Sequence, residues 1–201
     1  ISNGVHYFGG MEATGTANLV GAAGASGRMV LENGRLDVGY LRVGVNSGLT
    51  GYPSELTVNN GTLAVRAGLS SGTFFDTGLA LGVAHDDNAS TDPNAVVNMT
   101  QNNGVIDLPT SCLRLGGSSP SSSGTVTLNL NGGILRTRYI QIAGAANNWK
   151  TLNLNGGTLV FMESGDAFRG EGATATNTVI NLKSGGFTID TSTNRVRLVS
   201  R

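Results

Sequence analysis

A near-identical octet occurs twice in this chain. Residues 128–135 read Leu-Asn-Leu-Asn-Gly-Gly-Ile-Leu and residues 152–159 read Leu-Asn-Leu-Asn-Gly-Gly-Thr-Leu, so the second copy begins 24 residues after the first. Self-similarity at such a period marks a repeat protein, in which one supersecondary unit buries its apolar face by stacking on copies of itself. The sequence therefore predicts a stack of similar units around a continuous core.

Looser copies of the octet extend the repeat over most of the chain. They begin near residues 29, 56, 97 and 180, with a partial copy at residues 3–5. The aligned glycines are separated by 27, 43, 29, 24 and 29 residues; they are Gly34, Gly61, Gly104, Gly133, Gly157 and Gly186. The 43-residue step indicates an insertion within one repeat.

Each copy has the pattern of two short strands joined by a corner. Apolar and polar residues alternate, as in Leu152, Asn153 and Leu154, which is typical of strands with one buried face. The Asn-Gly or Gly-Gly pair tolerates a positive φ, so the chain can bend there and resume an extended path. A further short strand is predicted in several copies, at residues 40–44, 78–82, 112–116 and 139–144.

Short strands at this spacing are compatible with a hairpin repeat, a propeller blade or one coil of a parallel solenoid. A propeller blade needs about 40–45 residues, and hairpins need tight two-residue turns between strands of equal length. We therefore predict an all-β fold, a parallel β-helix (β-solenoid) of about six to seven coils, as a single domain over residues 1–201. Like side chains should then stack in rows, and Asn residues should form ladders.

Charge and hydropathy exclude two classes of partner. The chain has 13 basic and 13 acidic residues, a formal charge of zero and no run of like charges. Because duplex binding relies largely on a basic field, we expect no nucleic-acid partner. No apolar stretch approaches the length of about 18 residues that a membrane-spanning helix requires, so we expect no membrane span in this segment.

The octet at residues 152–159 and its looser copies resemble the autotransporter-associated β-strand repeats of bacterial passenger domains and large surface proteins. The resemblance covers roughly residues 28–199. It implies a right-handed parallel β-helix that is extracellular or displayed on the bacterial cell surface. Proteins of that group serve as adhesins, stalks and assembly modules, and related β-helices carry polysaccharide lyases, so the resemblance implies an architecture more specifically than a function.

The two ends of the chain have no clear polar cap, which a solenoid needs to cover its open core. The sequence starts at Ile1 and ends at Arg201, directly after a strand-like stretch. We therefore expect the chain to be a segment of a longer product, or a protomer whose ends are capped by neighbours.

The insertion at residues 85–94 has the highest density of metal-ligating residue types. Calcium takes hard oxygen ligands of the kind that this loop offers, which are Asp86, Asp87, Asn88 and Asp92. An adjacent Asp pair also resembles the carboxylates of β-helix polygalacturonases, but the Gly-His-Gly and Arg-Ile-Lys motifs of those enzymes do not occur. The loop matches neither the EF-hand spacing nor the Gly-rich calcium repeat. Because a polar loop with Asx turns explains the same residues, we expect no cofactor and keep calcium as the alternative.

Three further residues are candidates for ligand binding. Arg136 and Arg138 flank Thr137, and strand alternation predicts that both point to one side, where they could contact acidic sugars or simply form a solvated face. Trp149 follows Ala-Asn-Asn at a predicted turn and is the aromatic residue that we expect to be exposed to solvent. There it could bind surface glycans. Cys112, the single cysteine, lies in an alternating stretch that predicts a buried side chain rather than a catalytic thiol.

Two classes of function remain. The first is a non-enzymatic extracellular structural or adhesive module that assembles end to end into fibres or a surface layer, through self-association or neighbouring solenoid domains. The second is a carbohydrate-binding or polysaccharide-degrading β-helix, in which the loop at residues 85–94 and Arg136 or Arg138 converge on one groove. No catalytic motif occurs in the sequence, so we predict the first class and a chain that is not an enzyme.

Overall fold

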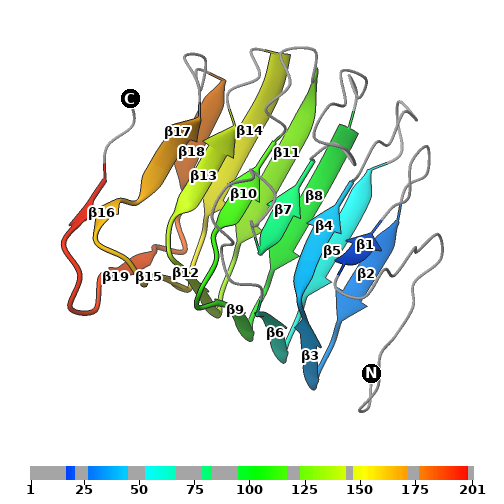
Figure 1. Cartoon of the computed structure of the whole chain (residues 1–201), viewed down its shortest axis with the longest axis horizontal. Coiled ribbons are helices and arrows are strands. Elements are labelled where there is room, and N and C mark those ends of the chain that lie inside the picture. Colours follow the sequence, from blue (N-terminus) through cyan, green and yellow to red (C-terminus); the bar gives the residue numbers. More distant parts are fainter. Residues whose placement is uncertain are drawn as a thin grey trace.

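The computed structural model describes residues 17–20, 27–44, 53–66, 78–82, 95–116, 123–143, 147–171 and 177–198. Within these residues the secondary structure consists of β-strands, with no helix. Three parallel sheets of six strands each form the body of the protein, and a fourth sheet has two strands. The strands of each large sheet cross the long axis of the molecule and are stacked side by side along it (Figure 1).

Successive strands visit the three large sheets in turn. The first sheet contains β2 (Arg28–Leu31), β5 (Ser54–Val58), β8 (Ala95–Gln101), β11 (Ser123–Leu130), β14 (Asn147–Leu154) and β18 (Thr178–Leu182). The second contains β3 (Arg35–Val38), β6 (Thr62–Val65), β9 (Val105–Leu108), β12 (Ile134–Thr137), β15 (Thr158–Phe161) and β19 (Thr188–Asp190). The third contains β1 (Ala17–Val20), β4 (Tyr40–Val43), β7 (Leu79–Leu81), β10 (Leu113–Leu115), β13 (Ile140–Ala143) and β17 (Phe168–Glu171). The small sheet pairs β16 (Gly165–Asp166) with β20 (Val196–Arg197).

This topology confirms the predicted parallel β-solenoid. Among the described residues, five coils contribute a strand to all three large sheets, β1 precedes them, and β18 and β19 follow them. The number of complete coils is lower than the six to seven predicted. The copy near residue 180 adds strands to only two of the large sheets, and the partial copy at residues 3–5 lies outside the described residues.

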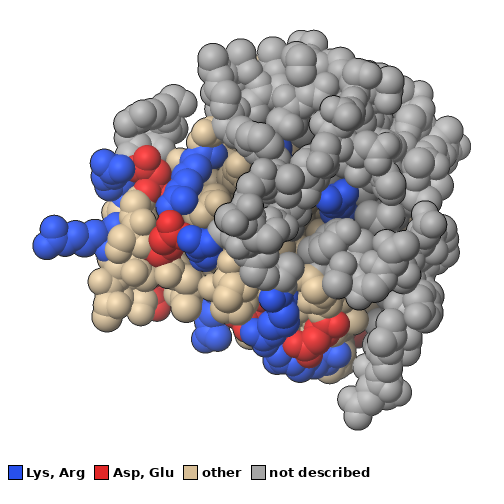
Figure 2. Space-filling model, viewed as in Figure 1, with Lys and Arg blue, Asp and Glu red and all other residues tan. Residues whose placement is uncertain are grey.

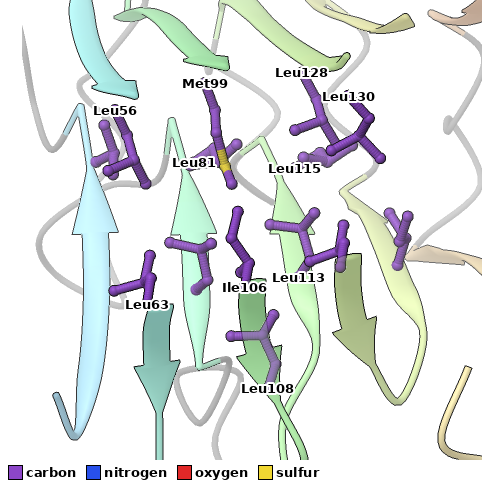
Figure 3. Close-up of a cluster of buried hydrophobic side chains, with 14 of the residues drawn as sticks. Leu56, Leu63, Leu81, Met99, Ile106, Leu108, Leu113, Leu115, Leu128 and Leu130 are labelled. Atoms are coloured by element: carbon purple, nitrogen blue, oxygen red, sulfur yellow. The ribbon is translucent and has the colours of Figure 1, made fainter. Parts of the chain in front are cut away.

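The core is built from rows of apolar side chains in register. In the first sheet Leu56, Met99, Leu128 and Leu152 follow one another from coil to coil, and all four are fully buried. Leucines and isoleucines of the other two sheets point into the same interior (Figure 3). Because each fully buried side chain of this kind contributes about 1.5–3 kcal/mol, the rows are the main source of stability.

Glycine is required at the corner between the first and second sheets by both conformation and space. Gly104 and Gly133 have φ values of +77° and +75°, in the left-handed region. A Cβ atom on Gly104 would lie 2.4 Å from the carbonyl oxygen of Gly61, and one on Gly133 would lie 2.4 Å from that of Gly104. The Asn-Gly and Gly-Gly pairs of the sequence thus mark places where the backbones of successive coils touch.

The predicted Asn ladders are present. At the corner after the first sheet, the side-chain Nδ2 of Asn102 donates to Oδ1 of Asn59 at 2.8 Å, and that of Asn131 donates to Asn102 at 2.9 Å. Asn59 in turn donates to the carboxylate of Glu32 at 2.9 Å. Every amide donates toward the N-terminal end, so the ladder has one direction and ends on a carboxylate.

The strand register shows where the 43-residue step gains its length. Leu56 pairs with Met99 and Leu63 with Ile106, both 43 residues apart, so the corner between them is unchanged. The preceding coil has a step of 27, which leaves 16 additional residues. Leu41 pairs with Leu79, 38 residues on, so 11 of the 16 enter between β6 and β7 and the other five between β7 and β8.

Candidate functional site

The predicted calcium loop at residues 85–94 cannot be placed. Asp86, Asp87, Asn88 and Asp92 lie outside the described residues. Within the described ranges, no group of three or more His, Cys, Asp and Glu side chains is arranged to hold a metal ion. Calcium therefore stays a prediction from the sequence.

Arg136 and Arg138 lie in different surroundings. Arg136 is exposed on the outer face of the second sheet, in register with Asp107 and Val160. Arg138 follows the end of β12, which ends at Thr137, and its guanidinium contacts the carboxylate of Glu163. Strand alternation does not continue through Arg138, because the chain turns there toward the third sheet.

A charged cluster surrounds Glu163. Its two carboxylate oxygens contact Arg138 at 2.5 Å and Arg169 at 2.8 Å. The guanidinium carbon of Arg169 lies 3.8 Å from the centroid of the Tyr139 ring, within cation–π range. Figure 2 shows basic and acidic side chains interspersed on the visible face of the C-terminal end of the molecule. The cluster joins the corner after β12 to the segment between β15 and β17.

The carboxyl of Glu163 and the nearby thiol of Cys112 have shifted pKa values. Burial opposes ionisation of Glu163, but Arg169 and Arg138 outweigh it and lower the pKa of its carboxyl. The Cys112 thiol, which interacts with Tyr139, is fully buried, and burial raises its pKa to about 11. Because the thiolate is the reactive form, this shift disfavours reaction of the thiol at neutral pH; the predicted burial of Cys112 is confirmed.

Trp149 is 55% exposed, as predicted. The predicted turn at this position is wrong, because Trp149 lies within β14, on the outer face of the first sheet, where strand alternation turns its side chain outward. Its outward-facing neighbours on β14 and β11 are polar and uncharged. We call the outward-facing side chains of β8, β11, β14 and β18 the amide face. Its members are Val96, Asn98, Thr100, Thr125, Thr127, Asn129, Trp149, Thr151, Asn153, Val179 and Asn181.

The C-terminal end of the solenoid exposes residues that are core residues in every other coil. Ile180 and Leu182 are in register with the buried Leu152 and Leu154 but are 37% and 77% exposed. Ile189 follows the buried Leu159 in the same way and is 37% exposed. We call Ile180, Leu182 and Ile189 the end face.

The N-terminal end differs. Met29 and Leu31 of β2, the first strand of its sheet, are 2% and 1% exposed, and Leu36 of β3 is also buried. The apolar rows are thus exposed at the C-terminal end and buried at the N-terminal end, where β2 and β3 are the edge strands of their sheets. The expectation that both ends lack polar caps stays a prediction, because residues 1–16 and 199–201 lie outside the described residues.

Two features of these sites were not recognised from the sequence. Glu163 and Arg169 lie in a stretch of mixed charge without a recognisable motif, yet they form a cluster with Arg138, which is 25 residues from Glu163 in the chain. The residues of the end face follow the same apolar pattern as their counterparts in the other copies. The sequence therefore gives no sign that these residues are exposed.

The comparisons with known proteins give no family for this chain. No family model matches it, and no curated protein or solved structure matches it. Among the described residues, no helix is both long enough and apolar enough to cross a membrane.

Proposed function

We propose that this chain is a non-enzymatic structural or adhesive module that associates with a second copy through the end face. The observation that supports it is the exposure of Ile180, Leu182 and Ile189 in rows whose other members are buried. Removing apolar surface from water is the dominant driving force of association, and an open sheet edge also offers unpaired backbone groups. A location outside the cell, implied by the resemblance to autotransporter-associated repeats, belongs to the same proposal.

The exposure of apolar row residues at the C-terminal end, where the equivalent residues of β2 and β3 are buried, favours a pair of rods over an endless fibre. Head-to-tail stacking needs two open ends, whereas a two-fold arrangement uses the same surface twice and closes. In such a pair β18 lies antiparallel to its counterpart, and the two first sheets continue across the interface. Paired rods are then the unit of any larger structure that this module builds.

The state of the charged cluster supports a structural assignment. Glu163 is held as a carboxylate by two arginines, and the Cys112 thiol is buried and protonated at neutral pH. Neither group is placed to act as a general acid, a base or a nucleophile. The cluster stabilises a corner of the solenoid instead.

The test is the oligomeric state of the protein over a concentration series, measured by size-exclusion chromatography with light scattering. We expect a dimer that dissociates on dilution, and Leu182→Lys should be monomeric. Because the substitution removes one buried leucine from each partner, at about 1.5–3 kcal/mol each, the dissociation constant should rise about a hundredfold or more.

Met162→Lys is the matched control, because Met162 is an apolar residue, 43% exposed, that is not part of the end face. It should dimerise like the unmodified chain. A protein that stays monomeric at every concentration, or a Leu182→Lys variant that still dimerises, would contradict the proposal. Negative-stain electron microscopy should show rods of doubled length.

A further inference from the structure

The exposed tryptophan lies within an ordered grid of polar side chains. Trp149, Thr151 and Asn153 are successive outward-facing residues of β14, and Thr125, Thr127 and Asn129 are their partners on β11; all six are in register. From Trp149 to Asn153 the strand extends over about 13 Å, at 3.3 Å per residue. The indole is therefore placed at one side of a flat surface that is large enough for several sugar rings.

The asparagines of this surface are held in fixed orientations. The side-chain Nδ2 of Asn153 donates to Oδ1 of Asn129 at 2.8 Å, and that of Asn181 donates to Oδ1 of Asn153 at 2.9 Å. Asn129 donates in the same direction to Oγ1 of Thr100 at 3.3 Å. A carboxamide has two N–H donors and an oxygen with two lone pairs, so Asn129 and Asn153 each keep one donor and one acceptor site. Ligand binding would need little further ordering of these groups.

The amide face is uncharged. Its described members from Val96 on β8 to Asn181 on β18 include no acidic or basic side chain. Lys150 of β14 is buried on the inner face of the sheet, and the described charges on the outer face are the Arg28–Glu55 pair on β2 and β5. An acidic polymer would find no cation on this surface. A ligand whose groups both donate and accept hydrogen bonds fits it, as do hydroxyl groups.

From these three features we infer that the amide face around Trp149 is a binding site for an uncharged polysaccharide. A sugar ring packs its apolar C–H face on the indole, and the hydroxyls of neighbouring rings bond to the remaining amide groups of Asn153 and Asn129. Thr151 and Thr127 supply further hydroxyls between them. The site defines the adhesive surface of the module, and it is separate from the end face.

Trp149 is the only tryptophan in the chain, so intrinsic tryptophan fluorescence reports on this site alone. The probes are three neutral polymers, xyloglucan, glucomannan and hydroxyethylcellulose, and one acidic polymer, polygalacturonate. We expect a saturable change of the emission with at least one neutral polymer and no change with polygalacturonate. Retardation in native gels that contain each polymer gives a second measurement that does not need the fluorophore.

In those gels, Trp149→Ala should bind at least tenfold more weakly, and Trp149→Phe should keep part of the affinity because a ring remains. Met162→Ala, which removes an exposed apolar side chain elsewhere, should bind normally. The inference is overturned if no neutral polymer binds, if polygalacturonate binds better, or if Trp149→Ala is retarded like the unmodified chain. Leu182→Lys should still bind, so failure of the end-face proposal and failure of this inference are separate results.

Discussion

A lysine occupies an inward-facing position of the first sheet, and replacing it should stabilise the protein. Lys150 is in register with the buried Val126 on one side and with Thr178 on the other. Its side chain is fully buried, and its Nζ atom has no hydrogen-bond partner among the described residues. Burial lowers the pKa of this amine from 10.5 to about 8, because desolvation penalises the ammonium form.

The free energy involved follows from the size of that shift. A decrease from 10.5 to about 8 corresponds to about 3 kcal/mol at 1.36 kcal/mol per pKa unit. At pH 7 the amine is protonated in both the folded and the unfolded chain, so the folded state carries the full penalty. Lys150→Met keeps the length of the side chain and removes the charge. We expect it to raise the free energy of unfolding at pH 7 by about 3 kcal/mol.

The pH dependence separates this cause from better packing. Between pH 8 and 10.5 the unfolded chain still binds the proton of Lys150 and the folded chain does not, so stability should increase with pH across this window. The other groups that titrate there are the same in the Lys150→Met variant. The difference between the two proteins should therefore shrink from about 3 kcal/mol at pH 7 toward zero near pH 10.5.

Urea unfolding followed by circular dichroism at pH 7, 8, 9 and 10 measures this difference. Lys183→Met is the control, because Lys183 is an exposed lysine next to β18 and its replacement should change stability by less than about 0.5 kcal/mol. The reasoning is refuted if Lys150→Met is no more stable than the unmodified chain at pH 7, or if its advantage is the same at every pH.

Two further predictions concern the corners and the core. Gly104→Ala should be less stable than Gly186→Ala by about 2 kcal/mol in the same urea assay. Both glycines have φ near +75°, so the backbone strain of the substitution is similar at the two positions. Only at Gly104 would the new methyl group meet the backbone of the preceding coil, at 2.4 Å. Equal losses would show that backbone strain, and not contact between coils, sets the glycine requirement. Cys112 should react with a thiol reagent at pH 8 only after denaturation, because its side chain is fully buried and its pKa is raised to about 11; rapid labelling of the native protein would disprove this burial.

The fold could be predicted because its determinants are local and repeated. The alternation around Leu152 and Leu154 specifies which side of a strand faces inward, and each Asn-Gly or Gly-Gly pair specifies a corner. Repetition then aligns equivalent residues, so the rows and the Asn ladders follow from the period. The predicted burial of Cys112 rests on the same alternation, whereas the exposure of Trp149 was predicted from a turn and arises on the strand β14.

The candidate sites were less accessible to this reasoning because they depend on distances between coils. Arg136 and Arg138 are two residues apart, yet the strand ends between them and only Arg138 reaches Glu163. Lys150 faces inward like Leu152 and Leu154, but the sequence does not show that its Nζ atom lacks a hydrogen-bond partner among the described residues.

The sequence by itself determined the repeat, the inward and outward sides of each strand and the position of each corner, since these depend on residues a few positions apart. The tertiary structure decided which coil is last in the stack and which charged groups meet. Leu182 has the same local pattern as Leu154, but one is 77% exposed and the other 3%, because burial depends on whether another coil lies over the row. That is a property of the stack and not of any single repeat.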